Sequence, residues 1–379
     1  MNRRWKLMAS MAVLSMGLTA GAAAESTMAA IGRARAEFMA ALQPKTHRPV
    51  VAVLALNEGT ETTDFLVPHA ILRRANVATV VAVAPQRGRV DLMPALAVHV
   101  DTDLAAFDQQ HPHGADYVVV PAMHRADDPR VVAWVQAQAG KGAVVMGVCS
   151  GALVLGRAGL LDARQFTGHW YDRSTLLKNQ HASYVAHARY HIDRAVVTTT
   201  GVSASVPVSL ALVEAIGGPA VAAKVAFELG VSDWGPAHDS TPFQLGVSEM
   251  WVTTKNTLLF WRHETVGIQV VAGVDAVQLA LAADAWSRTY RSKAVALAAS
   301  DQPVRLDSGL LLLHTPLRAQ QKSMRNVVLS NAIKPVCQLN RTLNDIAHAF
   351  GQSTRDWVAT QLEYGAQAAQ GNACDALAW

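Results

Sequence analysis

The sequence has few charged residues, few cysteines and no long apolar run beyond its N-terminus. Charged residues make up 16% of the 379, and Lys and Arg exceed Asp and Glu by only 33 to 29. Low charge combined with 51% hydrophobic residues argues against intrinsic disorder and predicts sizeable buried cores. The length exceeds that of one typical domain, so two globular units are expected.

The scarcity of cysteine also limits the chemistry. The chain has 3 cysteines, none close to another, and its 14 histidines lack the His-Glu-x-x-His spacing of zinc enzymes. We therefore expect no metal and no other cofactor. Cys337 and Cys374 lie in the C-terminal tail, where they could pair in an oxidising compartment or remain two unrelated thiols.

The apolar run at the N-terminus has the form of an export signal. Arg3, Arg4 and Lys6 precede an apolar stretch from Leu7 to Gly21, and an Ala-x-Ala cleavage site ends at Ala24. Cleavage would make the protein periplasmic or secreted without stable membrane insertion; a retained anchor is the alternative. Removing three of the 33 Lys and Arg leaves 30 basic residues against 29 acidic ones, which disfavours a nucleic-acid partner.

From residue 47 onward, short apolar runs alternate with helical stretches. This pattern predicts an α/β fold with a parallel sheet and helices on both of its faces. The expected strands are Val50–Leu54, Thr79–Val83, Tyr117–Val120, Ala143–Gly147 and Ala195–Thr199. The expected helices are Phe65–Arg74, Pro129–Ala139, Ser150–Gly156 and Pro207–Ile216.

The pattern divides the chain into a signal peptide, a leading helix with a linker, an α/β unit, a connecting segment and a second unit. Their boundaries are 1–24, 25–46, 47–231, 232–263 and 264–379. In the second unit, a strand and loop at Val266–Asp275 lead into a helix at Leu279–Tyr290, as Leu54–Glu61 leads into the first helix of the α/β unit. We interpret 264–379 as a truncated, degenerate half-repeat of the same fold with a helical tail.

Cys149 stands where an expected buried strand ends and a helix begins. Gly147 and Gly151 flank it in a Gly-x-Cys-x-Gly pattern, the thiol counterpart of the nucleophile elbow of serine hydrolases. The N-terminus of the following helix is expected to lower the thiol pKa and favour the thiolate. The alternative interpretation is a small buried cysteine after a strand.

Several segments of the α/β unit resemble the ThiJ/PfpI family, whose fold is class I glutamine-amidotransferase-like and flavodoxin-like. They are Glu61–Pro68 with Leu72–Ala75, Gly147–Ala152, Gly159–Asp162 with Thr167–Trp170, and Thr200–Ser205. The portion from Gly159 to Trp170 is most similar to the branch that contains isonitrile hydratase and the sensor domains of AraC-type regulators. The resemblance covers about residues 50–230 and implies a three-layer α/β fold.

The resemblance also implies catalytic residues beside Cys149. Asp64 matches the carboxylate that hydrogen-bonds the cysteine sulfur in the family, although a helix N-cap would equally explain an aspartate there. His169 stands where relatives carry a histidine near the cysteine; it is a candidate acid or base, or simply a packed histidine. Glu58 and Glu61 are interpreted as solvent-facing loop charges.

The sequence departs from the family at the expected oxyanion subsite. Relatives usually carry two glycines after the strand that ends in proline, and this chain has Ala122 and Met123 there. We nevertheless take Ala122, Met123 and Ser150 as the candidate binding residues of that subsite. Ser150 replaces the histidine of the protease-like members, which disfavours peptidase activity. His124 is a further candidate base by position alone.

Three functions stay open at this stage. The first is a cysteine-dependent hydratase, lyase or hydrolase acting on a small electrophile such as an isonitrile or a reactive carbonyl. The second is a ligand- or redox-sensing domain without turnover, and the third is a scaffold with a decayed site. Leu343–Arg355 faintly suggests a helix-turn-helix, but the export signal and the near-neutral charge argue against DNA binding. A small molecule is therefore the expected partner, and the oligomeric state, a homo-oligomer included, is left open.

Overall fold

The computed structural model describes residues 32–33, 35–178, 181–316, 324–365 and 374. The signal peptide expected at 1–24 lies outside these residues. Residues 32–33 and 35–41 are helical, and Phe38 and Leu42 of this leading segment are buried. Within the described ranges, no helix is both long and apolar enough to span a bilayer.

A seven-stranded sheet in the order β11-β12-β8-β7-β1-β3-β6 forms the centre of the first unit. Its strands are β1 (Val50–Leu54), β3 (Thr79–Ala84), β6 (Thr102–Asp103), β7 (Tyr117–Val120), β8 (Val144–Gly147), β11 (Tyr190–Asp193) and β12 (Val196–Thr199). Neighbouring strands pair in parallel, except that β11 and β12 form an antiparallel edge pair. The central strands are continuous apolar runs because helices cover both of their faces.

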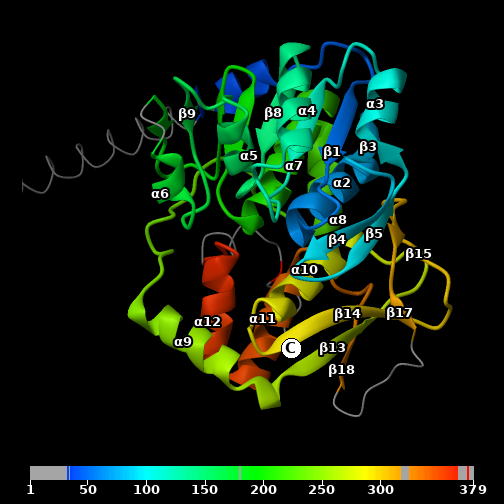
Figure 1. Ribbon diagram of the computed structural model, residues 1–379, viewed down its shortest axis with the longest axis vertical. Coiled ribbons are helices and arrows are strands. Elements are labelled where there is room, and N and C mark those ends of the chain that lie inside the picture. The colour runs from blue at the N-terminus through cyan, green and yellow to red at the C-terminus, as the bar shows by residue number, and fades with distance from the viewer. Residues whose placement is uncertain (1–31, 34, 179–180, 317–323, 366–373, 375–379) are drawn as a thin grey trace, which may run out of the picture.

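Alternate side chains of β1 belong to different buried clusters on opposite faces of the sheet. Val51 and Val53 share one cluster with residues of α2 (Thr62–Ala75), α7 (Ser205–Gly217) and α8 (Pro219–Leu229). Ala52 and Leu54 share the other with residues of α3 (Leu104–Gln110), α4 (Pro129–Gly140) and α5 (Gly151–Arg157). The expected flavodoxin-like arrangement of a sheet between two helical layers is confirmed (Figure 1).

A second, five-stranded sheet joins the two units in the order β15-β16-β5-β4-β2. Its strands are β2 (Thr60–Glu61), β4 (Gly88–Met93), β5 (Ala97–Val100), β15 (Val304–Arg305) and β16 (Leu311–Leu312). Leu311 and Leu312 of the second unit pair antiparallel with His99 and Val98 of the first. The main-chain hydrogen bonds of this ladder therefore hold segments more than 200 residues apart in the sequence.

The second unit contains a four-stranded parallel sheet in the order β17-β14-β13-β18. Its elements are β13 (Glu264–Gln269), α10 (Ala276–Ser287), β14 (Ser292–Ala298), β17 (Thr315–Pro316), β18 (Met324–Val328), α11 (Cys337–Phe350) and α12 (Gln352–Gln361). Helix α10 packs directly on α2, and Figure 1 shows it between the two sheets. The relation of this unit to the first by a half-repeat stays a prediction.

The remaining elements are short or lie in the connecting segment. They are α6 (Arg173–Leu176), β9 (Gln165–Phe166), β10 (Ser183–Tyr184), the 3-10 turns η1 (Val202–Ala204) and η2 (Phe260–Arg262), and α9 (Val247–Leu258). Cys337 and Cys374 form a disulfide with a Cα–Cα distance of 5.5 Å, which ties residue 374 to the start of α11.

Candidate functional site

Cys149 lies on the turn between β8 and α5. Its backbone has a φ of 53°, in the left-handed region that residues other than glycine rarely adopt. A Cβ on Gly151 would collide with the carbonyl oxygen of Val120, and one on Gly147 would lie 3.0 Å from the Ala152 nitrogen. The two flanking glycines are therefore needed for the close contact between this turn and the neighbouring backbone.

The turn opens onto a cavity of about 510 Å³ between the two units. The first unit contributes Glu61, Met93, Pro94, Ala122, Cys149, Ser150, His169, Trp170, Tyr171 and Val202. The second contributes Ser287, Arg288, Tyr290, Trp357 and Gln361. Its four aromatic rings and its size suit a small ligand with an apolar portion.

Asp64 lies in the first turn of α2 and is completely buried. Its carboxylate accepts hydrogen bonds from the Ala122 amide and the Ser205 hydroxyl, each at 3.2 Å. Burial outweighs these bonds and raises the pKa of Asp64 to about 7. Because Asp64 lies inside the helix, the N-cap alternative considered for it is wrong.

Glu61 is the N-cap of α2, accepting a hydrogen bond from the Asp64 amide at 2.5 Å. The expectation that Glu61 is a solvent-facing charge is wrong, because the residue is only 5% exposed and lines the cavity. Burial, followed by the charges of Asp284 and Asp64, raises its pKa well above the ordinary value. The sequence signal that could have indicated this N-cap role was the position of an acidic residue just before a helix.

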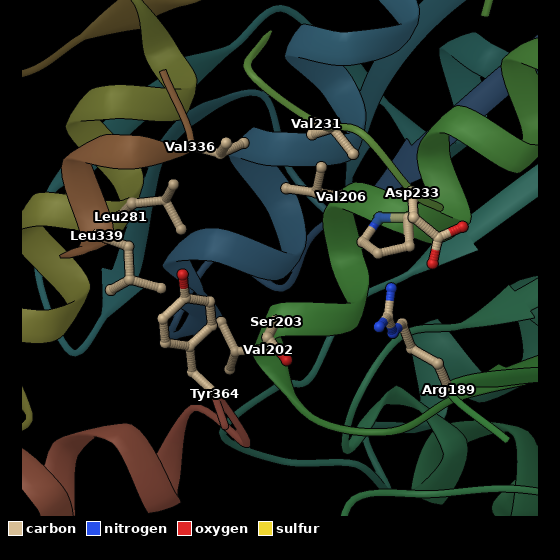
Figure 2. A pocket seen from close by; sticks show the side chains of 11 residues that line it. Arg189, Val202, Ser203, Val206, Val231, Asp233, Leu281, Val336, Leu339 and Tyr364 are labelled. Carbon is tan, nitrogen blue, oxygen red and sulfur yellow. The ribbon is translucent and has the colours of Figure 1, made fainter. Parts of the chain in front are cut away.

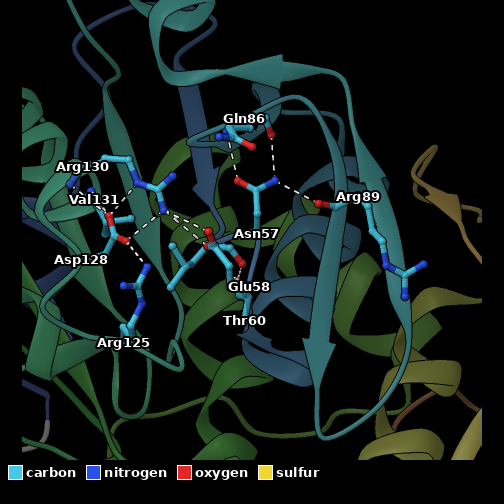
Figure 3. A network of polar contacts seen from close by, with 10 residues as sticks. Asn57, Glu58, Thr60, Gln86, Arg89, Arg125, Asp128, Arg130 and Val131 are labelled. Atoms are coloured by element: carbon cyan, nitrogen blue, oxygen red, sulfur yellow. Dashed lines mark hydrogen bonds and ion pairs between the residues drawn. The ribbon is translucent and has the colours of Figure 1, made fainter.

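Glu58, in contrast, lies at the surface as expected. Figure 3 shows it beside Arg130, whose Nη2 is 3.3 Å from Glu58 Oε1 and 3.0 Å from Asp128 Oδ2. Half of the Glu58 side chain is exposed, so this pair is screened by solvent. The two neighbouring glutamates thus differ in role: Glu58 pairs with Arg130 at the surface, whereas Glu61 faces the cavity.

Arg288 brings a cation from the second unit to the Glu61 carboxylate. Its Nη2 lies 2.7 Å from Glu61 Oε1, and its Nε lies 2.6 Å from Asp284 Oδ1. Thr63 of α2 donates a hydrogen bond to Asp284 at 2.8 Å, which fixes α10 against α2. No local pattern in the sequence could reveal Arg288, because only the packing of α10 places it at the site.

The pKa of Cys149 is raised, which contradicts the expected lowering. The causes are burial first, and then the charges of Asp64, Glu61 and Asp172. Arg288 acts in the opposite direction but is already paired with two carboxylates. Helix α5 has only 7 residues, so its dipole is a weak counterweight to three nearby acids.

His169 lines the cavity with both ring nitrogens engaged. Its Nε2 lies 3.2 Å from the Gln361 carbonyl oxygen, and its Nδ1 accepts the Tyr171 amide at 3.3 Å. A carbonyl can only accept and an amide can only donate, so the proton is on Nε2 and the ring is neutral. Burial lowers the pKa of His169, although Glu363 and Asp172 oppose this. The ring is thus held in place and has no nitrogen directed to a ligand.

Of the three candidate oxyanion residues, Ala122 and Ser150 line the cavity with Cys149, and their role in such a subsite stays a prediction. The Ala122 amide donates to Asp64, and Met123 lies in the apolar cluster on the other face of the sheet. The Ser150 hydroxyl donates to the Asp172 carboxylate, and the Cys149 amide donates to Thr199 Oγ1 at 3.0 Å. The side chain of His124 is exposed and does not line the cavity. The charges of three acids, Asp64, Glu61 and Asp172, act on the sulfur.

Comparisons with known proteins agree with this fold. Residues 50–215 match the model of the DJ-1/PfpI family. The chain is 26% identical over 187 residues to the Parkinson disease protein 7 homolog of Danio rerio, covering 48% of this chain and 97% of that protein. It is 29% identical over 121 residues to the HTH-type transcriptional regulator CdhR of Pseudomonas aeruginosa, covering 32% of this chain and 36% of the regulator.

Solved structures of the same group align with about half of this chain. Drosophila melanogaster DJ-1beta aligns with 22% identity and a TM-score of 0.44, covering 48% of this chain and 97% of its own. A ThiJ/PfpI family protein from Pseudomonas syringae aligns with 24% identity and a TM-score of 0.43, covering 48% and 74%. The family model and the curated relatives confirm the resemblance noted in the sequence: residues 50–215 are similar to the DJ-1/PfpI family.

Proposed function

We propose that the protein is a cysteine-dependent enzyme in which the Cys149 thiol adds to a small electrophile. The observation that carries the proposal is the buried carboxyl of Asp64, whose charge acts on the Cys149 thiol and whose pKa of about 7 suits proton exchange at neutral pH. The reaction class is hydration, lyase-type elimination or hydrolysis. Small carbonyls and isonitriles are the substrate classes that the site suits best.

For a carbonyl substrate, the first step forms a sulfur–carbon bond while the carbon–oxygen π bond breaks. The thiol proton passes to ionised Asp64, and the protonated form of Glu61, which the raised pKa of this residue favours, delivers a proton to the substrate oxygen. The product is a neutral hemithioacetal, so atoms and charge balance when Asp64 and Glu61 exchange a proton afterwards. Water attack or elimination from that adduct then completes turnover.

The contacts of the main-chain amides support acid assistance over an oxyanion hole. The main-chain N–H groups of Ala122 and Cys149 already donate hydrogen bonds to Asp64 and Thr199. An alkoxide in the cavity would lie near several carboxylates, and this arrangement raises its energy. Protonation by Glu61 as the bond forms avoids that charge.

A ligand-sensing domain without turnover is the second candidate. It is favoured by the match to part of the regulator CdhR and by the neutral, buried state of the Cys149 thiol. In that case the aromatic walls of the cavity would bind the ligand, and the second unit would transmit its presence. No chemistry beyond reversible binding is then required.

One set of assays separates the two candidates. The purified protein is incubated with an alkyl isonitrile and with an α-ketoaldehyde, and products are followed by NMR. An enzyme should show turnover that Cys149→Ser abolishes and that Asp64→Asn reduces at neutral pH. Saturable quenching of tryptophan fluorescence without product would support the sensor. Turnover that survives Cys149→Ser would overturn the cysteine mechanism, with Cys149→Ala checking for a serine that takes over.

We further propose that the mature protein begins at Glu25 and is exported. The charged and apolar N-terminal segment supports this, as does the disulfide between Cys337 and Cys374, since such bonds persist in oxidising compartments. Mass spectrometry of a periplasmic fraction should find the chain starting at Glu25. A full-length product confined to the cytoplasm would contradict export.

A further inference from the structure

Arg189 carries a buried guanidinium without an acceptor. The residue is 5% exposed, yet within the described part of the chain its side chain forms neither an ion pair nor a hydrogen bond. By comparison, Arg74 and Arg288 are each bound by two carboxylates. A guanidinium has five N–H donors, and buried charges in proteins are ordinarily paired. Among the described residues, none therefore supplies the partner that a buried charge such as Arg189 needs.

A small cavity of about 40 Å³ lies at Arg189, where the two units meet (Figure 2). Its walls are mostly apolar. Besides Arg189 and Asp233, the walls contain Val202, Ser203, Val206, Pro207 and Val231 from the first unit and Leu281, Val336, Leu339 and Tyr364 from the second. One water requires roughly 10–15 Å³ of such space, so the cavity accommodates an ion of two or three heavy atoms and excludes sulfate or phosphate.

Asp233 also lines the cavity but does not neutralise Arg189. Figure 2 shows its carboxylate on the same side as the guanidinium, yet the two form no ion pair. Asp233 is exposed, and its Oδ1 accepts the amide of Gly235 at 3.0 Å. A carboxylate in contact with solvent is strongly screened, so Arg189 keeps most of its positive potential within the cavity.

We propose that Arg189 and this cavity form a binding site for a small monovalent anion of the chloride or formate class. The anion accepts hydrogen bonds from the guanidinium and replaces the hydration that Arg189 loses on folding. Burial lowers the pKa of Arg189, in keeping with a cation that lacks a close counter-ion of its own. Because both units wall the cavity, the anion also stabilises their packing.

The test measures thermal unfolding of the purified full chain at constant ionic strength. Sulfate is replaced stepwise by chloride, bromide or formate. At about ten times the dissociation constant, each small anion should raise the midpoint temperature by about 2 °C, saturating with one site. Crystals grown in bromide should show an anomalous peak beside Arg189. No anion-specific shift and no peak would overturn the proposal.

Three variants distinguish a site at Arg189 from a general salt effect. Arg189→Met removes the charge and keeps the aliphatic stem, so the shift with chloride should disappear while stability in sulfate stays equal or rises. Arg74→Gln is a control that removes the ion pairs of Arg74 with Asp275 and Asp307. It should lower stability but keep the midpoint shift with chloride. Asp233→Asn should strengthen chloride binding several-fold. If Asp233→Asn instead abolishes the shift, a water-bridged Arg189–Asp233 pair replaces the proposed anion. If Arg189→Met fails to fold, the presence or absence of the bromide peak beside Arg189 in the wild type decides whether the anion site exists.

Discussion

Replacement of Asp64 by asparagine should change how the stability of the protein depends on pH. Asp64 is fully buried, and its pKa in the folded protein is about 7, against an ordinary value of 3.8. Below pH 3.8 both folded and unfolded chains hold the proton. As pH rises, the unfolded chain loses it first, so stability declines until the folded carboxyl also ionises near pH 7.

The size of the decline follows from the shift of about 3 units. At about 1.4 kcal/mol for each unit, Asp64 costs up to about 4 kcal/mol of folding free energy above pH 7. Asparagine has similar shape, can still accept from Ala122 or Ser205 and does not ionise. Asp64→Asn should therefore match the wild type near pH 4 and exceed it in stability at pH 8. Part of the decline should persist, because the raised pKa of Glu61 acts in the same direction.

Urea unfolding at several pH values between 4 and 8.5, followed by tryptophan fluorescence, measures this difference. Asp128→Asn is a matched control, because Asp128 is 2% exposed but paired with Arg125 and Arg130. These partners lower its pKa, so its contribution is present at neutral pH and is lost as pH falls. The two variants should thus have opposite signs at pH 8. An unchanged pH profile in Asp64→Asn would refute the buried-carboxyl argument.

Three further outcomes follow from buried groups elsewhere. Burial lowers the pKa of His69 to about 3. As pH falls below about 6.5, the unfolded chain binds a proton that the folded chain does not, so the free energy of unfolding declines. His69→Leu should remove several kcal/mol of this decline in urea titrations. Iodoacetamide should alkylate Cys149 with an apparent pKa above that of a free cysteine, and Glu61→Gln should lower it; a free-cysteine profile would contradict the acid cluster. Replacing Cys337 and Cys374 together by serine should cost about 4 kcal/mol for a loop of 37 residues, measured by reversible unfolding.

The first unit was largely predictable because its strands are buried on both faces. Such strands are continuous apolar runs, and β1 at Val50–Leu54 and β7 at Tyr117–Val120 have the expected bounds. The pair β4 and β5 was missed, since β4 alternates buried and exposed residues and has no such run. Helix α9 was missed for a different reason. Val247 is 86% and Trp251 67% exposed, so its apolar side chains do not mark an inward face.

At the candidate site, sequence reasoning could find residues fixed by local geometry. The glycines around Cys149 mark a tight turn, and the motif that contains Asp64 marks this residue as a candidate partner of the sulfur. It could not find Arg288, which is 227 residues from its partner Glu61 and reaches it only through the packing of α10 on α2. The direction of the Cys149 pKa was missed for the same reason, because the acids that raise it converge from separate segments.

The ladder between β16 and β5 has a consequence for how the protein could be cut or expressed. A chain ending after α8 would leave β5 with unpaired main-chain groups along one side, an open edge that can pair with the same strand of another molecule. It would also uncover the apolar face of α2 that α10 buries. We expect such a fragment to aggregate. By covering this strand edge and this helix face, the second unit prevents self-association of the first.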